Sequence, residues 1–299
     1  MDNAMPRAVI GIGSNAVRML TACVCDGALI GVKRYREDVR TFAGLSASGL
    51  SEETMARVIS AVMRLYETAR EDGAELVGLI ATSATRDAAN ADDLAQRIYG
   101  GMGIVMNVLT GEEEAQLGFA GATAGQKGRC GMIDIGGGST ELAIGADGET
   151  ESLISLQLGA ARLARDVIIS AESKSVEPEA VLAGIEQTLS ESRGELPESM
   201  PREWVGVGGT FHTLARIGMG GASDVEGIEL TQEIVARIAD ELHRIPLAQR
   251  CSVPGLPPRR ADIIVPGAWI ALACMRALRI QSITVTERGN LDGYLLSAC

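Results

Sequence analysis

The sequence predicts an α/β protein made of two similar lobes, and a turn that occurs twice is the main reason. Residues 133–141 read as an apolar strand, three glycines with a serine, and the start of a returning strand. The same plan occurs once before, at residues 10–18. Small residues let the backbone approach a ligand closely and adopt positive φ, so several N–H groups can converge on one anion. Two such hairpins predict a phosphate-bearing ligand held between two halves.

The length and composition are those of a two-domain globular protein. The 299 residues are 46% hydrophobic and 22% charged, which is enough for two cores. We expect an N-terminal lobe at 1–124 and a C-terminal lobe at 125–299, joined by a linker rich in Gly, Ala and Thr near 121–128. No apolar run approaches the ~18–20 residues of a membrane span, and the first residues lack the form of a secretory signal. A cytoplasmic protein is therefore expected.

Charge and cysteine content exclude several classes of partner. The net charge of −12 argues against binding to nucleic acid or to an anionic membrane surface. The six cysteines form no CxxC pair and only two histidines are present, so a zinc site is not expected. In a cytosolic setting the cysteines are predicted to be reduced structural thiols.

Periodicity and turn residues predict the order of elements, which is similar in the two halves. In the first half we expect strands at 8–12, 17–25 and 29–36, a helix after Ser51, a strand at 76–81, a helix at 88–99, a strand at 104–109 and a helix from Gly111. In the second half we expect strands at 131–135, 140–145 and 151–158, helices near 160–170 and 177–193, a strand at 204–208, helices at 211–217, 233–243 and 261–278, a strand at 282–286 and a helix at 291–296. Two hairpin-led α/β halves describe a duplicated ribonuclease-H-like architecture, that of the actin-like ATPases, with the ligand in an interlobe cleft.

Three glycine turns supply the predicted phosphate contacts, and one acidic residue stands beside them. Asp134 ends an apolar strand just before the second turn, where a carboxylate can hold Mg²⁺ directly or through water. Glu141, in the returning strand, is expected to help place the metal or a water molecule beside the phosphate. The expected phosphate-binding residues are Gly13, Ser14, Asn15, Arg18, Gly136, Gly137, Gly138, Ser139, Thr140, Gly208, Gly209 and Thr210.

Six motifs, in order along the chain and the last of them in two segments, carry a more specific resemblance. They are Gly-Ile-Gly-Ser-Asn-Ala-Val-Arg at 11–18, Thr-Ser-Ala-Thr-Arg-Asp-Ala-Ala-Asn at 82–90, Thr-Gly-Glu-Glu-Glu-Ala at 110–115, Ile-Asp-Ile-Gly-Gly-Gly-Ser-Thr-Glu-Leu at 133–142, Val-Gly-Gly-Thr at 207–210, and the closing pair Ala-Asp-Ile-Ile at 261–264 and Glu-Arg-Gly at 287–289. On these segments the chain resembles the exopolyphosphatase/guanosine pentaphosphate phosphohydrolase family, the Ppx/GppA phosphatases.

The resemblance implies roles that single residues would not reveal. It implies that Glu114 is the catalytic base, although a glutamate in the first turn of a helix otherwise reads as dipole compensation. It also implies that Arg86 binds the phosphate or a catalytic carboxylate, and that Mg²⁺ is the cofactor, held by Asp134 and Glu141. His212, which follows the third glycine turn, is either an acid or an ordinary residue of a helix N-terminus, and the family does not require a histidine there.

One position departs from the family pattern. The first motif of the family ordinarily begins with Asp, whereas this chain has Gly11. Loss of a carboxylate from a metal site can cost orders of magnitude in rate.

Three interpretations follow for function. The first is a Mg²⁺-dependent hydrolase that releases the terminal phosphate of polyphosphate or guanosine pentaphosphate. The second is a weakened sensor that binds polyphosphate or guanosine tetra- and pentaphosphate, and the third is a sugar or acetate kinase of the same superfamily. The apolar helices near the C-terminus read either as core or as the face of a homodimer.

Overall fold

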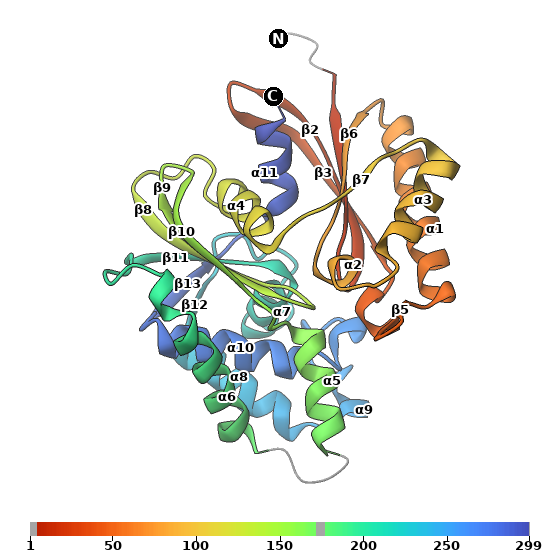
Figure 1. The fold of residues 1–299 in the computed structure, drawn as a ribbon. Coiled ribbons are helices and arrows are strands. Elements are labelled where there is room, and N and C mark those ends of the chain that lie inside the picture. Colours follow the sequence, from red (N-terminus) through yellow and green to blue (C-terminus); the bar gives the residue numbers. More distant parts are fainter. Residues whose placement is uncertain (1–4, 172–176, 299) are drawn as a thin grey trace.

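The chain folds into two lobes, each built on its own sheet with helices packed against it (Figure 1). A computed structural model describes residues 5–171 and 177–298. Of the cysteines, Cys299 lies outside the described residues, and the five within them form no disulfide with one another. Among the described helices, none combines the length and the apolar character needed to cross a bilayer.

The first lobe is built on a five-stranded sheet in the order β3-β2-β1-β6-β7, with β1 antiparallel to β2 and parallel to β6. Its elements are β1 (Arg7–Ile12), β2 (Ala16–Cys25), β3 (Ala28–Asp38), β4 (Leu45–Ser46), β5 (Gly49–Leu50), α1 (Glu52–Glu71), β6 (Glu75–Ala81), α2 (Ser83–Arg86), α3 (Ala91–Met102), β7 (Met106–Val108) and α4 (Gly111–Ala122). Alternation along β1 sends Ile10 and Ile12 to the face covered by α1 and α3, and Val9 to the opposite face.

The second lobe repeats this plan with a six-stranded sheet in the order β10-β9-β8-β11-β13-β12. Its elements are β8 (Arg129–Ile135), β9 (Thr140–Ala146), β10 (Glu149–Leu156), α5 (Ala160–Ala171), α6 (Pro178–Glu191), β11 (Glu203–Val207), α7 (Gly208–Gly218), β12 (Glu229–Thr231), α8 (Gln232–Arg244), α9 (Leu247–Arg250), α10 (Ile264–Ala277), β13 (Ser282–Val285) and α11 (Asn290–Ser297). A large core under α7, α8 and α10 fills one face of this sheet.

Two helices cross between the lobes. α4 ends the first half of the chain, yet Phe119 and Ala122 pack on the second sheet against Met132. α11 ends the second half, yet Leu291 and Leu295 pack on the first sheet, so Figure 1 shows the blue helix beside β2. Each lobe is therefore completed by a helix that lies on the other side of the predicted boundary at 124/125.

The crossing helices touch through glycine. A Cβ on Gly121 of α4 would collide with the backbone of Gly289 and Gly293, and a Cβ on Gly293 would collide with the Leu117 carbonyl. Only residues without side chains allow two helix backbones to approach this closely.

Most predicted elements are confirmed, and the differences have local causes. The helix expected at 88–99 begins at Ala91, because the Asn90 side chain instead pairs with both backbone groups of Leu50, at 2.8 and 2.9 Å. The helix expected at 261–278 begins only at Ile264, after a 3-10 turn at Pro258–Arg260. The strand β12 was not predicted, since three residues carry no usable periodicity.

Candidate active site

The two repeated turns lie opposite each other and enclose a cavity of about 80 Å³. Ser14 and Asn15 line it from the first lobe, and Gly136, Gly137 and Ser139 line it from the second. The turns are in close contact, because a Cβ on Gly137 would lie 2.8 Å from the Ser14 Cβ. A space of this size suits a single phosphate group.

The third glycine segment differs from the expected turn. α7 begins at Gly208, directly after β11, so Gly208 and Gly209 are the first residues of an 11-residue helix and not a loop before it. Gly208 has φ of 85°, which side chains rarely tolerate, and a Cβ there would collide with the Asp134 carboxylate. The free N–H groups and positive end of a helix N-terminus favour an anion at this wall.

Buried donors around the cavity lack partners. The Asn15 Nδ2 and Arg260 Nε atoms are buried and have no hydrogen-bond partner within the described part of the chain. Arg260 lies over Gly209 and is buried, and this burial lowers its pKa to about 9, so it remains charged at neutral pH. Unpartnered buried donors are costly unless a ligand satisfies them. Together with Arg18, they point to a bound anion.

Two carboxyl groups, Glu114 and Asp134, line the other side of the cavity, and Glu141 lies behind them. Asp134 and Glu141 are direct partners in the β8–β9 ladder, so both side chains project toward the face that α4 covers. Glu114 lies in the first turn of α4, where Thr110 and Glu113 form a capping box that fixes the helix start. The sheet register and the crossing helix thus bring together three acidic residues from separate elements.

Burial raises the pKa values of all three groups, and repulsion by neighbouring carboxylates adds to this effect at Glu114 and Glu141. Burial, reinforced by Asp134 and offset by Arg86, raises the pKa of Glu114 to about 7. Burial raises the pKa of Asp134, and no described residue donates a hydrogen bond to its carboxylate. Burial, then Glu114 and Asp134, raise the pKa of Glu141 well above its usual value, although Ser155 donates a 2.9 Å hydrogen bond to it. A carboxyl group with a pKa near 7 is suited to general base chemistry.

The donor set fits Mg²⁺ in the way this ion is usually held. Within the described residues, no group of three or more His, Cys, Asp and Glu side chains could hold a metal by itself. Mg²⁺ commonly takes one or two protein carboxylates and completes its shell with water and substrate phosphates. The Asp134 carboxylate, which lines the cavity and lacks a protein donor, fits this pattern, with buried Glu141 beside it.

Arg86 lies behind Glu114 and does not line the cavity. Its Nη1 donates to the Leu109 carbonyl at 2.7 Å and lies 3.4 Å from Glu114 Oε2. Of the two partners expected for Arg86, phosphate or a catalytic carboxylate, the structure shows the carboxylate.

Comparison with known proteins places this geometry in a family. The model of the Ppx/GppA phosphatase family matches residues 23–299. Exopolyphosphatase 2 of Mycobacterium tuberculosis is 32% identical over 312 aligned residues, which cover 97% of each chain. The chain belongs to the Ppx/GppA phosphatase family. A guanosine-5'-triphosphate,3'-diphosphate pyrophosphatase of Aliivibrio fischeri is 28% identical over 96% of this chain and 58% of its own length.

The solved structures agree with this membership. The Ppx/GppA enzyme of Aquifex aeolicus superposes with a TM-score of 0.82 at 26% identity, covering 98% of this chain and 99% of that one. An exopolyphosphatase-like protein superposes with a TM-score of 0.87 at 25% identity, covering 98% and 97%. The predicted duplicated ribonuclease-H-like fold, with two lobes and an interlobe cleft, is confirmed.

The structure brings most of the predicted site residues of this Ppx/GppA protein to one cavity. Those that line it are Gly13, Ser14, Asn15, Arg18, Glu114, Asp134, Gly136, Gly137, Ser139, Gly208 and Gly209. The hydroxyl groups of Thr140 and Thr210 are used elsewhere, because they donate to the carbonyls of Leu158 at 2.5 Å and Ile135 at 3.3 Å. Gly138 and Glu141 lie behind the lining.

The sequence did not predict two arginines of the site. Arg260 and Arg36 line the cavity, but Arg260 only precedes the Ala-Asp-Ile-Ile segment, and Arg36 lies near the end of a charged edge strand that reads as solvated. Arg260 directly precedes the closing Ala-Asp-Ile-Ile motif, and an arginine at that place in a phosphate-binding family was the available signal.

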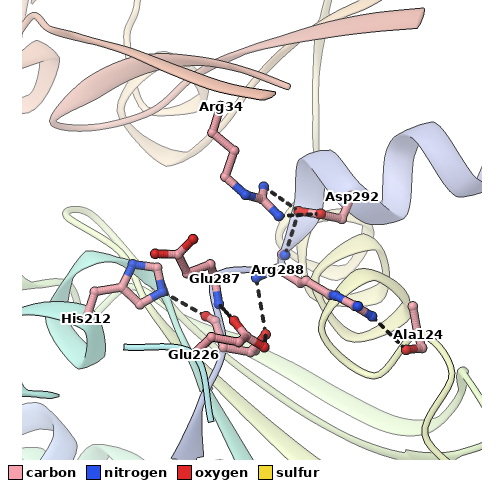
Figure 2. A network of polar contacts seen from close by, with 9 residues as sticks. Arg34, Ala124, His212, Glu226, Glu287, Arg288 and Asp292 are labelled. Atoms are coloured by element: carbon pink, nitrogen blue, oxygen red, sulfur yellow. Dashed lines mark hydrogen bonds and ion pairs between the residues drawn. The ribbon is translucent and has the colours of Figure 1, made fainter. Parts of the chain in front are cut away.

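His212 is not an acid at neutral pH. Burial lowers its pKa to about 4. Its Nε2 lies 2.7 Å from the Thr286 carbonyl, and a dashed line from the labelled His212 ring marks this contact in Figure 2. Because a carbonyl only accepts, the neutral ring carries its proton on Nε2 and leaves Nδ1 as an acceptor.

Gly11 occupies the position that corresponds to Asp134 in the repeat, and its surroundings are apolar on one side. A Cβ on Gly11 would lie 2.8 Å from Leu291 Cδ2 of the crossing helix α11. Its ladder partner is Arg18, which donates to Asn290 Oδ1 at 3.4 Å and pairs with no carboxylate among the described residues. The second repeat thus supplies carboxylates at this level of the sheet, whereas the first supplies an arginine.

Proposed function

We propose that this chain is a Mg²⁺-dependent phosphohydrolase that releases the terminal phosphate of inorganic polyphosphate or guanosine pentaphosphate. The observation that carries the proposal is one phosphate-sized cavity that joins unpartnered buried donors to a carboxyl group of pKa about 7. The names of the relatives, exopolyphosphatase and guanosine pentaphosphate pyrophosphatase, support the same substrates.

The chemistry divides between the walls of the cavity. The amides of the two turns and of the α7 N-terminus, with Arg18 and Arg260, hold the oxygens of the terminal phosphoryl group and stabilise their charge. Glu114, deprotonated, accepts a proton from a water whose oxygen attacks phosphorus. The bridging P–O bond breaks, and the shortened phosphate chain leaves with the electron pair.

Two further groups support this step. Arg86 holds the Glu114 carboxylate in place and favours its anionic form. Mg²⁺, held by Asp134 with Glu141 beside it, would neutralise phosphate oxygens and lower the cost of bringing them among three acidic residues.

The test is phosphate release from tripolyphosphate, long polyphosphate and guanosine pentaphosphate in the presence of Mg²⁺. Glu114→Gln is expected to lower kcat by at least about 10²-fold and to retain ligand binding in calorimetry. Glu112→Gln, an exposed neighbour in the same helix turn, is the matched control and should retain activity within about twofold. Turnover in Glu114→Gln equal to wild type would remove Glu114 as the base.

A sensor is the second candidate, and Gly11 is the observation that favours it. The wild-type protein could bind all three substrates in calorimetry and release phosphate from none of them. This result would favour a sensor that signals through ligand binding over the hydrolase.

A further inference from the structure

The carbonyl oxygens of the first phosphate turn are bound by one short segment that follows β3. Backbone N–H groups of residues 39–42 donate to the carbonyls of Asn15 and Ser14, at 2.9 and 2.8 Å. The Thr41 hydroxyl donates to the Gly13 carbonyl at 3.0 Å. The N–H groups of a turn attract an anion, whereas its carbonyl oxygens repel one. By binding the carbonyls, this segment helps to decide how the turn faces a phosphate.

The second phosphate turn is held in a similar way by the residues that follow β10. N–H groups at the start of α5 donate to the carbonyls of Gly136 and Gly137, at 2.9 and 2.8 Å. The Arg162 Nε donates to the Gly138 carbonyl at 2.7 Å. In both repeats, therefore, the residues after the third strand bind the carbonyls of the phosphate turn. We call these two stretches the holding segments, residues 39–42 and 160–162.

Each holding segment also reaches the opposite lobe through an arginine. Arg40 forms an ion pair with Asp262, which precedes α10 in the second lobe. Arg162 forms an ion pair with Asp87, which follows α2 in the first lobe. The two segments also touch each other, because the Arg162 guanidinium lies 5.1 Å from the centre of the Phe42 ring. Each phosphate turn is thereby tied to the lobe that carries the other turn.

The backbone of Arg40 has an unusual conformation. Its φ is 51° and its ψ is 49°, in the left-handed region that residues with side chains seldom adopt. A residue held there costs free energy that the surrounding structure must supply, and such residues cluster at functional sites. At Arg40 the same residue donates its N–H to the Asn15 carbonyl and directs its side chain to Asp262.

A neighbouring contact joins the same end of β3 to the wall of the catalytic cavity. Asp38 accepts from Arg36, which lines the cavity, at 2.8 Å, and its carboxylate lies 3.1 Å from Arg259 Nε of the second lobe. Farther back along the strand, Arg34 makes two hydrogen bonds to Asp292 of α11, at 2.7 and 3.0 Å (Figure 2). The ion pairs that join the two sides of the cavity are thus found where β3 reaches the first phosphate turn.

We propose that Arg40 and Arg162 are positioning residues that fix the two phosphate turns relative to each other and so set the affinity for a phosphate group between them. Neither belongs to the described residues that line the catalytic cavity, so each acts through the carbonyls of its own turn and a carboxylate of the opposite lobe. Both ion pairs are partly exposed, and such pairs contribute little to stability by themselves. The inference rests on the proposed function, because it concerns how the terminal phosphate is bound.

The first test exchanges the charges of one ion pair. Tripolyphosphate binding is measured by calorimetry with Mg²⁺ in the full chain carrying Glu114→Gln, which removes the proposed base. Adding Arg40→Asp should weaken binding about 10-fold, because two carboxylates then face each other between the lobes. Adding Asp262→Arg as well should restore the affinity to within about threefold.

The matched control is Arg64→Gln, which removes an exposed arginine whose ion pair with Glu37 of β3 lies within the first lobe. It should leave the affinity for tripolyphosphate unchanged within about twofold. Equal affinity with and without Arg40→Asp, or a loss that the charge exchange does not recover, would overturn the proposal.

A second variant separates positioning from folding. Arg40→Gly removes the guanidinium and lets the backbone adopt a φ of 51° without steric cost. The midpoint of urea unfolding should therefore not fall below that of the background, while tripolyphosphate binding weakens by about 5- to 10-fold. A lower midpoint with unchanged binding would show that Arg40 serves the fold alone, and would overturn its positioning role.

Turnover distinguishes this inference from the hydrolase proposal. With Glu114 intact, Arg40→Asp is expected to raise KM for tripolyphosphate about 10-fold and to keep kcat within about threefold, since the turns bind the phosphate in the ground and transition states alike. Wild-type protein without turnover, together with the binding loss and its recovery, would remove the hydrolase and keep the positioning role. Turnover without any binding loss in Arg40→Asp would remove the positioning role and keep the hydrolase.

Discussion

Replacing Arg86 by glutamine should move the pH dependence of catalysis to higher pH. The base must be deprotonated, so kcat/KM in the wild type should rise with pH through about 7, the pKa of Glu114. Arg86 Nη1 lies 3.4 Å from Glu114 Oε2, and both side chains are largely buried. The arginine stabilises the carboxylate, so its removal raises the pKa of Glu114.

The size of this effect can be worked from the contact. An opposite charge within ~4–6 Å lowers a carboxyl pKa by about 1 to 3, and we take the lower part of this range because Arg86 is one of several charges near Glu114. The midpoint should therefore move to between about 8 and 9. At pH 7 the deprotonated fraction of Glu114 falls from about half to roughly 1–10%, so kcat/KM should fall about 5- to 50-fold.

The assay is kcat/KM for tripolyphosphate between pH 5.5 and 9.5 at saturating Mg²⁺. Activity of Arg86→Gln should return to within about twofold of wild type near pH 9.5, a recovery that a folding defect would not show. Arg97→Gln removes an exposed arginine of the same lobe and should leave the midpoint unchanged. An unmoved or lowered midpoint in Arg86→Gln would refute the reasoning.

Three other substitutions address the metal, the departure from the family pattern and the lobe contact. Asp134→Asn should raise the Mg²⁺ concentration for half-maximal activity by at least about 10-fold, and an unchanged Mg²⁺ titration would exclude this carboxylate as a ligand. Gly11→Asp should raise KM for polyphosphate about 10-fold without raising kcat, because the new carboxylate stands opposite Arg18 and competes for its charge; a higher kcat would instead mark the wild type as attenuated. Arg34→Met should lower the free energy of unfolding by about 2–3 kcal/mol in urea titrations, since Asp292 is 3% exposed and keeps only the Gly289 N–H; a loss below about 1 kcal/mol would show that water replaces the arginine.

The sequence predicted the fold well because the same glycine-rich turn occurs in both halves of the chain and reveals the repeat. Glycine-rich hairpins after apolar strands place both sheets, and the strands that follow them keep clear apolar patterns. Helix starts were predicted less well where a side chain serves tertiary structure, as Asn90 does by pairing with Leu50. The crossing of α4 and α11 was not predictable, because an apolar helix face does not indicate which sheet it covers.

The candidate site was predictable where its residues belong to recognisable sequence motifs. Glu114, Asp134 and the turn residues stand in recognisable segments, and the structure gathers them at one cavity. Arg260 and Arg36 were missed because a single arginine has no pattern, and only the tertiary fold shows that Arg260 is buried over a glycine.

Because α4 packs on the second sheet and α11 on the first, a repeat of the sequence and a folded lobe are not the same set of residues. A gene fragment cut at the repeat boundary would encode a first sheet whose inner face lacks Leu291 and Leu295, and a second sheet that lacks Phe119. Each fragment would expose the apolar surface that its partner covers, so we expect neither half to be stable and soluble alone. Expressed together, the same fragments carry complementary surfaces with the Gly121–Gly293 contact at their centre. The duplication has therefore made two copies that are no longer independent, and mutations that adapt one half must remain compatible with a helix inherited from the other.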